Sequence, residues 1–110
     1  MKGKGDSGEL VIDGTVVGMV TLTGFDGTWC FGEFRANREF EKFATLFGAW
    51  SLLIHDDEDR RLSPEAAEEL RIAEAAIDRL DAHVKDPHSG ERTRIRQLNI
   101  DSNLIEWRND

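Results

Sequence analysis

The sequence predicts a single α+β domain, in which an antiparallel sheet of about five strands packs one face against a two-helix hairpin. Three observations lead to this fold class. Two Asp-Gly pairs separate early runs of β-branched and aromatic residues, two amphipathic helical patterns follow, and two further β-rich runs end the chain. A length of 110 residues suits one domain. The expected order of elements is βββ-αα-ββ.

The first three strands are predicted over residues 9–12, 15–23 and 28–35. The pairs Asp13-Gly14 and Asp26-Gly27 lie between them. Asp-Gly is a strong hairpin signal, because a type I′ turn needs positive φ at both central residues. Gly18 and Gly32 fall inside strands, where a bulge or a close backbone contact is expected.

Two helices are predicted next, over residues 38–54 and from Pro64 to about Lys85. The first has an apolar side chain at every third or fourth position: Phe40, Phe43, Phe47, Trp50 and Ile54. Ser63 before Pro64 is a helix start signal. The second helix continues the same period through Ala66, Leu70, Ala73, Ile77, Leu80 and Val84. We expect Phe47 and Leu70 to be core residues that face each other.

The last two strands are predicted over residues 93–100 and 104–108. His83 is expected near the end of the second helix, where a positive charge is favourable, and His88 is expected to be exposed. Residues 1–8 contain three glycines and no apolar residue after Met1. They are predicted to be a flexible tail before a domain at 9–110.

The formal net charge is −8, and residues 56–86 contribute −6 of it. Because an acidic surface repels phosphate backbones, we expect no useful affinity for nucleic acid. No apolar stretch is long enough to span a bilayer, and the N-terminus lacks the apolar region of a signal peptide, so no membrane association is expected. The single cysteine excludes an intrachain disulfide, and together these features predict a cytoplasmic protein.

The sequence contains no motif for phosphate-loop, dinucleotide, metalloprotease or serine-hydrolase chemistry. This favours a non-catalytic role without a cofactor, although a site built from distant residues stays possible. The densest set of metal-ligand types is weak: His55, Asp56, Asp57 and Asp59. A solvated loop at 55–61 is the alternative, and we expect a fold that needs no metal. Cys30 has no neighbouring base and is expected to be a buried, inert thiol.

Six residues form a candidate contact surface on the sheet: Trp29, Phe31, Glu33, Arg94, Arg96 and Trp107. Trp29 and Phe31 share one face of a strand, and Cys30 and Phe34 share the other, so both faces carry aromatic side chains. Three roles are open for Trp29 and Phe31. They contact another molecule, they line a ligand pocket, or they belong to the core because a twisted sheet turns them inward.

The arginine pair on the fourth strand allows two roles. Arg94 and Arg96 are two residues apart and so share a face. Their guanidinium groups suit a carboxylate or phosphate. They also suit a structural role in which they neutralise the acidic helices.

The segment Asp26-Gly27-Thr28-Trp29, followed by Gly32-Glu33-Phe34 and then by Phe40 and Leu46-Phe47, resembles a set of small bacterial proteins of unknown function. The resemblance covers about residues 9–50. It implies an uncharacterised bacterial protein and, because that set has no known activity, it implies no site residue.

The sequence therefore favours a small acidic binding domain without catalytic activity, whose partner is a protein or a second copy of the chain. The alternative is a small ligand-binding domain or enzyme with a pocket on the Trp29/Phe31 face. A hollow of about 300 Å³ or more, with convergent polar groups, would favour the alternative. A flat apolar patch would favour the protein partner.

Overall fold

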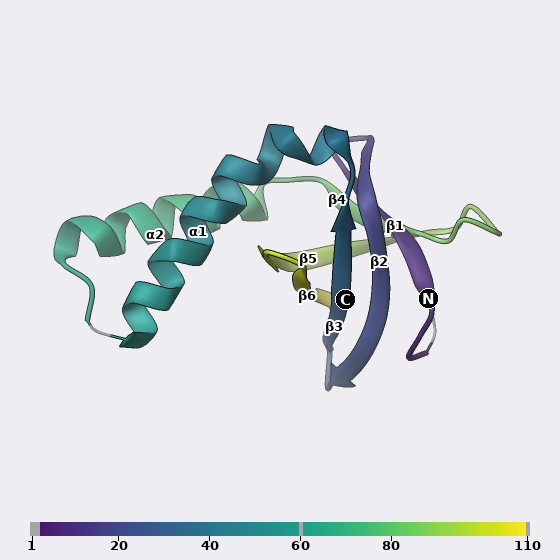
Figure 1. The fold of residues 1–110 in the computed structure, drawn as a ribbon, viewed down its shortest axis with the longest axis horizontal. Helices are drawn as coiled ribbons and strands as arrows, with labels where there is room; N and C mark the ends of the chain where they lie inside the picture. The colour runs from purple at the N-terminus through teal and green to yellow at the C-terminus, as the bar shows by residue number, and fades with distance from the viewer. Residues whose placement is uncertain (1–2, 60, 110) are drawn as a thin grey trace.

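The computed structural model describes residues 3–59 and 61–109, with the side chains of all of these except 56–59 (Figure 1). The strands are β1 (Ser7–Ile12), β2 (Thr15–Asp26), β3 (Trp29–Ala36), β4 (Ala82–Lys85), β5 (Arg92–Asp101) and β6 (Leu104–Asn109). A short 3-10 helix, η1 (Arg38–Phe40), leads into α1 (Glu41–Asp59), and α2 (Pro64–Asp78) follows. The fold class is α+β, as predicted, with one strand more than expected.

The strands form a closed antiparallel barrel rather than an open sheet. Their order is β1-β2-β3-β6-β5-β4, and the pairing of β1 with β4 closes the ring. The helices therefore do not cover one face of a sheet. They form a hairpin that contacts β5 and extends from one side of the barrel (Figure 1). Hydrophobic periodicity could not reveal the closure, because it does not specify which distant strands pair.

The unexpected strand is β4, which was predicted to be the last turn of the second helix. That helix ends at Asp78, with Arg79 as its C-cap. Val84 satisfies a helical period and a strand period equally well, which explains the error. In the barrel Val84 points inward and His83 points outward. His83 therefore lies on a strand, and the predicted charge at a helix end is wrong.

The hairpin turn at Asp13-Gly14 and the close contacts of the first strands are confirmed. Asp13 and Gly14 both have positive φ, as a type I′ turn requires. At the second pair only Gly27 has positive φ: Asp26 ends β2 and pairs with Trp29, so the hairpin forms but its turn residues are Gly27 and Thr28 rather than Asp26 and Gly27. A Cβ atom on Gly32 would lie 2.7 Å from the carbonyl oxygen of Thr21, so only glycine fits there. β1 begins at Ser7, which is two residues before the predicted start of the domain.

α2 starts at its predicted signal, η1 is capped by Asn37, and α1 ends later than expected. The side chain of Asn37 accepts a hydrogen bond from the N–H of Glu39, and that of Ser63 accepts one from Ala66. α1 continues to Asp59 instead of ending at residue 54, so residues 55–59 are helical rather than a loop. This stretch contains neither glycine nor proline, and nothing in it breaks the helix.

One core joins the barrel to the helices. Inward-facing side chains of all six strands fill the barrel, because a small barrel encloses little more than side chains. Phe34 of β3 contacts the ring of Phe40 at a centroid distance of 5.0 Å, and Phe40 stacks on Phe47 at 5.9 Å. Phe47 and Leu70 are buried, as predicted. No helix in the described ranges is long and apolar enough to cross a membrane.

Candidate functional site

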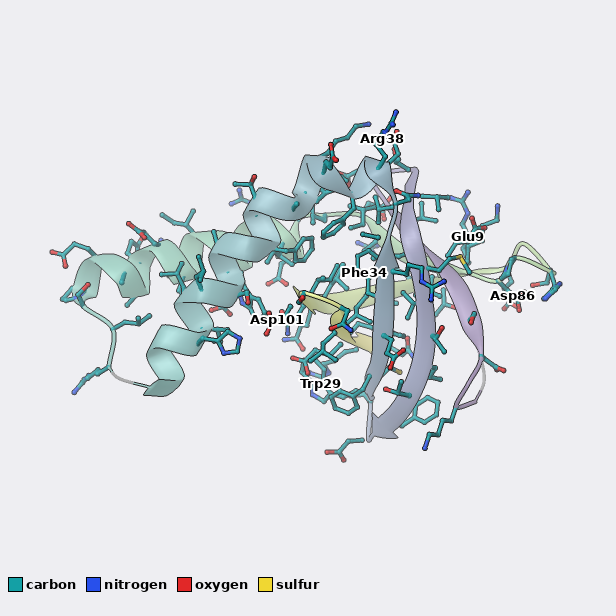
Figure 2. The ribbon with its side chains drawn as sticks, viewed as in Figure 1. Glu9, Trp29, Phe34, Arg38, Asp86 and Asp101 are labelled. Carbon is teal, nitrogen blue, oxygen red and sulfur yellow. The ribbon has the colours of Figure 1, made fainter. Side chains whose placement is uncertain are left out.

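A groove runs between the helix hairpin and strands β5, β6 and β3, and we call it the hairpin groove. It consists of three adjoining hollows of about 570, 160 and 510 Å³. The first and second share Asp78 and Gln97, and the second and third share Glu74 and Asn99. Helix α2 therefore follows the groove past all three. Figure 2 shows Trp29 and Asp101 on the side of the barrel from which the hairpin extends.

Strand register sets the order of side chains on the outer face beside the groove. The first row across β3, β6 and β5 is Trp29, Arg108 and Arg96, the second is Phe31, Glu106 and Asn99, and the third is Glu33, Leu104 and Asp101. Members of a row are neighbours, since adjacent strands lie about 4.8 Å apart. The face therefore changes from basic in the first row to acidic and apolar in the third.

Basic side chains oppose one another across β4, β5 and β6. Lys85 pairs with Arg92, His83 with Arg94, and Arg96 with Arg108. We call Lys85, Arg92, Arg94, Arg96 and Arg108 the basic face. Its four arginines are exposed. Like charges directly opposite each other destabilise a sheet, so this arrangement is unfavourable for the fold alone.

The structural role considered for Arg94 and Arg96, which was to neutralise the acidic helices, stays a prediction, and Arg96 does have an interaction partner. Within the described ranges, the side chain of Arg94 forms no hydrogen bond or ion pair. Asp78 of α2 lines the same 570 Å³ hollow as Arg94, Arg96 and Arg108. The hollow is thus lined by three guanidinium groups and one carboxylate.

A β-bulge in β5 shapes this end of the groove. The register between β5 and β6 shifts between Arg96 and Asn99, and Gln97 has a φ of 50°. Ile95 faces inward before the bulge and Leu98 faces inward after it, so Arg96 and Gln97 are both exposed. Positive φ is uncommon for glutamine, and bulges frequently lie beside functional sites. The strained residue lies in the wall of the largest hollow.

Arg108 is held in place by its neighbours. Its Nε donates to the hydroxyl of Thr28 at 3.1 Å, and its Nη1 donates to Oε1 of Gln97 at 3.3 Å. Its guanidinium carbon lies 5.8 Å from the ring centroid of Trp29, within cation–π range. A guanidinium has five N–H donors, and only two are used in these bonds. Arg108 is therefore positioned in advance to donate to a ligand.

At the opposite end of the groove, a carboxylate of β5 forms hydrogen bonds with α1. Asp101 of β5 accepts a hydrogen bond from the Ser51 hydroxyl at 2.7 Å, and its other oxygen lies 2.7 Å from Nε2 of His55. The bond from Ser51, followed by that with His55, holds the pKa of Asp101 below its ordinary value. These contacts attach α1 to the barrel.

The Ser51–Asp101–His55 group does not have the geometry of a hydrolase. In that chemistry the imidazole accepts the proton of the serine hydroxyl. Here the Ser51 hydroxyl donates to the Asp101 carboxylate, and Nε2 of His55 is directed at the same carboxylate. The group is therefore suited to holding a helix against a strand.

The six predicted contact residues occupy different places. Trp29 lines the 160 Å³ hollow, and Arg94 and Arg96 line the 570 Å³ hollow beside it. Phe31 lines the 510 Å³ hollow. Glu33 faces a separate hollow formed with β2. Trp107 is not on a surface at all: it is 2% exposed inside the barrel, where its indole N–H donates to Asn109 at 3.1 Å.

Two further predictions concern cysteine and metal ions. Cys30 is buried inside the barrel and accepts a hydrogen bond from the Asn109 amide at 3.1 Å, and burial raises the pKa of its thiol. Three or more His, Cys, Asp or Glu side chains suited to a metal ion do not come together anywhere in the described part of the chain. The side chains of Asp56, Asp57 and Asp59 lie outside that part.

Sequence reasoning missed Arg108 and Gln97. Arg108 is important because it lies between Trp29 and Arg96, and that position depends on β6 pairing with both β3 and β5. The chain order alone does not give this pairing. A local signal for the bulge existed, since the alternation of polar and apolar residues breaks between Ile95 and Leu98.

Comparison of the chain with protein-family models, with curated proteins and with solved structures finds no match. The resemblance of residues 9–50 to small bacterial proteins therefore stays a prediction. Function has to be inferred from the geometry and charge of the hairpin groove.

Proposed function

We propose that this protein is a non-catalytic binding domain that holds a small anionic ligand at the basic end of the hairpin groove. The observation that carries the proposal is the convergence of Arg94, Arg96 and Arg108 on one hollow of about 570 Å³. Guanidinium groups bind phosphate and carboxylate through paired N–H donors. A bound anion would offset the repulsion between Arg96 and Arg108.

The size of the hollow and the charge of the chain favour a small anion over a long one. Ligand pockets commonly measure about 300–1,000 Å³, and this hollow falls within that range. A nucleic acid strand would extend past the basic face onto a chain whose net charge is −8. That charge would repel its phosphates, so weak affinity for nucleic acid remains our prediction.

Calorimetric titration with pyrophosphate at low ionic strength tests the proposal. We expect a dissociation constant below about 1 mM for the wild type. An Arg94→Gln/Arg108→Gln double variant should bind at least about tenfold more weakly, because it loses charge-assisted hydrogen bonds. Arg35→Gln is the matched control, since Arg35 is an exposed strand residue beside a different hollow. Added salt should weaken binding by screening.

Two results would overturn the proposal. One is the absence of wild-type binding at about 10 mM pyrophosphate, which would place any affinity below a useful level. The other is equal binding by the wild type and the double variant, which would locate the anion elsewhere. Circular dichroism of the double variant verifies that its barrel is folded.

A protein partner or a second copy of the chain is the second candidate, and a separate observation favours it. Leu52 of α1 is 72% exposed, Ile72 of α2 is 56% exposed, and Leu104 beside the turn between β5 and β6 is 60% exposed. Such side chains are suited to a protein contact when they gather on one surface. This candidate does not require the basic face.

A further inference from the structure

We infer that the anion is the phosphate of a nucleotide, and that its base lies in the hairpin groove beside Trp29. This inference rests on the proposed anion site and extends it to the neighbouring hollow. It assigns a role to Trp29, Glu74 and Asn99, which the anion alone does not need.

The position of Trp29 is the first support. Trp29 is half-buried on β3 and lines the 160 Å³ hollow that adjoins the arginine-lined one. Every nucleobase has a π-face, and stacking on an aromatic side chain is a common way to hold one. Arg108 lies over the ring of Trp29. The aromatic surface for the base and the cationic surface for the phosphate are therefore in direct contact.

The hydrogen-bonding groups in this hollow are the second support. Glu74 and Asp78 of α2 both line it, and Asn99 lies in its wall. The Asn99 amide donates to Glu106 at 3.0 Å, so its carbonyl oxygen remains an acceptor. Carboxylates and a carbonyl oxygen are acceptors that suit a ring with N–H donors. The carboxylates would repel a second phosphate. The arginine-lined hollow therefore suits an anionic group of the ligand, and the adjoining hollow suits a group with N–H donors.

The spacing of the two parts is the third support. Trp29 and Arg96 flank Arg108 on neighbouring strands. Two strand spacings amount to roughly 10 Å between their backbones. One nucleotide spans this separation between its phosphate and its base. A phosphate on the arginines therefore places a ring at Trp29 without a change in the fold.

The test compares adenosine monophosphate with ribose 5-phosphate, which carries the same phosphate without the base. We expect the wild type to bind adenosine monophosphate about tenfold more tightly, a typical gain from one stacked base. Tryptophan fluorescence is a second readout. Trp107 is buried in the barrel, whereas Trp50 lines the 510 Å³ hollow, so the quenching that is lost in Trp29→Leu measures the share that comes from Trp29.

Two variants separate the base from the phosphate. Trp29→Leu should remove the advantage of adenosine monophosphate, and Phe25→Leu should retain it, because Phe25 is an exposed aromatic residue outside the groove. Trp29 also contacts Arg108, so its loss could disturb the phosphate site. Glu74→Gln leaves Trp29 and Arg108 in place and should lower the preference for adenosine monophosphate over ribose 5-phosphate, because it removes a charged acceptor from the base hollow.

The outcomes distinguish this inference from the proposed function. Equal affinity for the two phosphates, with ribose 5-phosphate binding still dependent on Arg94 and Arg108, would refute the base site and leave the anion site standing. If neither phosphate nor pyrophosphate binds, the proposed function itself fails. A tenfold preference that survives both Trp29→Leu and Glu74→Gln would place the base outside this hollow.

Discussion

Lys85 has unlike neighbours on its two sides: Arg92 of β5 and Glu9 of β1. The first pairing is repulsive and the second is attractive. Arg92 does not line the 570 Å³ hollow, where the other arginines meet. Its charge therefore affects the stability of the sheet with little direct effect on the hollow.

We predict that Arg92→Glu raises the free energy of unfolding by about 0.2–1 kcal/mol, because it converts a repulsive cross-strand pair into an attractive one. Urea unfolding at neutral pH and low salt measures the change. Arg92→Gln should give an intermediate gain, since it only removes the repulsion. A less stable glutamate variant would show that Lys85 and Arg92 do not interact across the strands.

At single positions, the sequence predicts which side chains share a face but not which face is inside. Trp29 and Phe31 share one face, and the alternation is correct for both. The sequence could not show which of the two faces is buried, because Cys30 and Phe34 make the other face of the strand equally apolar. Trp107 was assigned to the surface for the same reason. Its indole N–H bonds to Asn109, which allows a polar group to be buried.

Among the elements, one carboxylate of β5 adds polar contacts with α1 to the apolar contacts that join the hairpin to the barrel. Asp101 receives bonds from Ser51 and His55, which lie one turn apart on α1. Its side chain is 39% exposed, so solvent weakens the interaction and the expected contribution is modest. His55 and Asp101 also line the 510 Å³ hollow.

We predict that Asp101→Asn lowers stability by about 0.5–1 kcal/mol at pH 7. The pKa of Asp101 is lowered in the folded state, so its contribution is complete above the unfolded value of about 3.9 and is lost as pH falls through the folded pKa. The difference from wild type should therefore shrink as pH falls below the unfolded value of about 3.9. Urea unfolding at neutral pH and at successively lower pH measures it.

Glu33→Gln is the control for this experiment. Glu33 is an exposed strand carboxylate that forms no salt bridge with the described residues. Its replacement should change stability little at either pH. A cost for Asp101→Asn that persists unchanged in acid would mean that the asparagine disturbs packing rather than removing a charged acceptor.

Local signals explain which elements were predictable. Asp-Gly turns and the Ser63-Pro64 start signal act within a few residues, and the structure confirms the hairpins and the start of α2 there. β4 has only four residues, which is too few for its alternation to differ from a helical period. The basic end of the groove could be predicted only in part from the sequence, which identified Arg94 and Arg96 as candidates. Arg108 joins them through strand pairing, which no local pattern encodes.

At the scale of the whole molecule, the exposed apolar residues of the hairpin predict self-association. We expect sedimentation at about 100 μM to give a mass above the 12.4 kDa of one chain, because association would cover the exposed apolar side chains of the hairpin. A Leu52→Ser/Ile72→Ser variant should return to the monomer mass. Phe25→Ser should keep the mass of the wild type, because Phe25 is an exposed residue of β2 and not of the hairpin.

A wild type that stays monomeric would contradict self-association and leave the anion site unaffected. An unchanged mass in the double variant would indicate that a dimer uses another surface. The measurement thus tests the hairpin as a self-contact surface independently of the basic face.

Closure of the barrel also governs how this chain folds. β1 pairs with β2, which follows it directly in the sequence. It can pair with β4 only after both helices, which lie between them in the chain, have been synthesised. Contacts between distant residues form slowly because the intervening chain loses entropy first. Until β4 arrives, β1 presents a free edge on which another chain could pair. The free edge of β1 therefore lasts through the synthesis of both helices, which predicts a period in which the chain is open to misassembly.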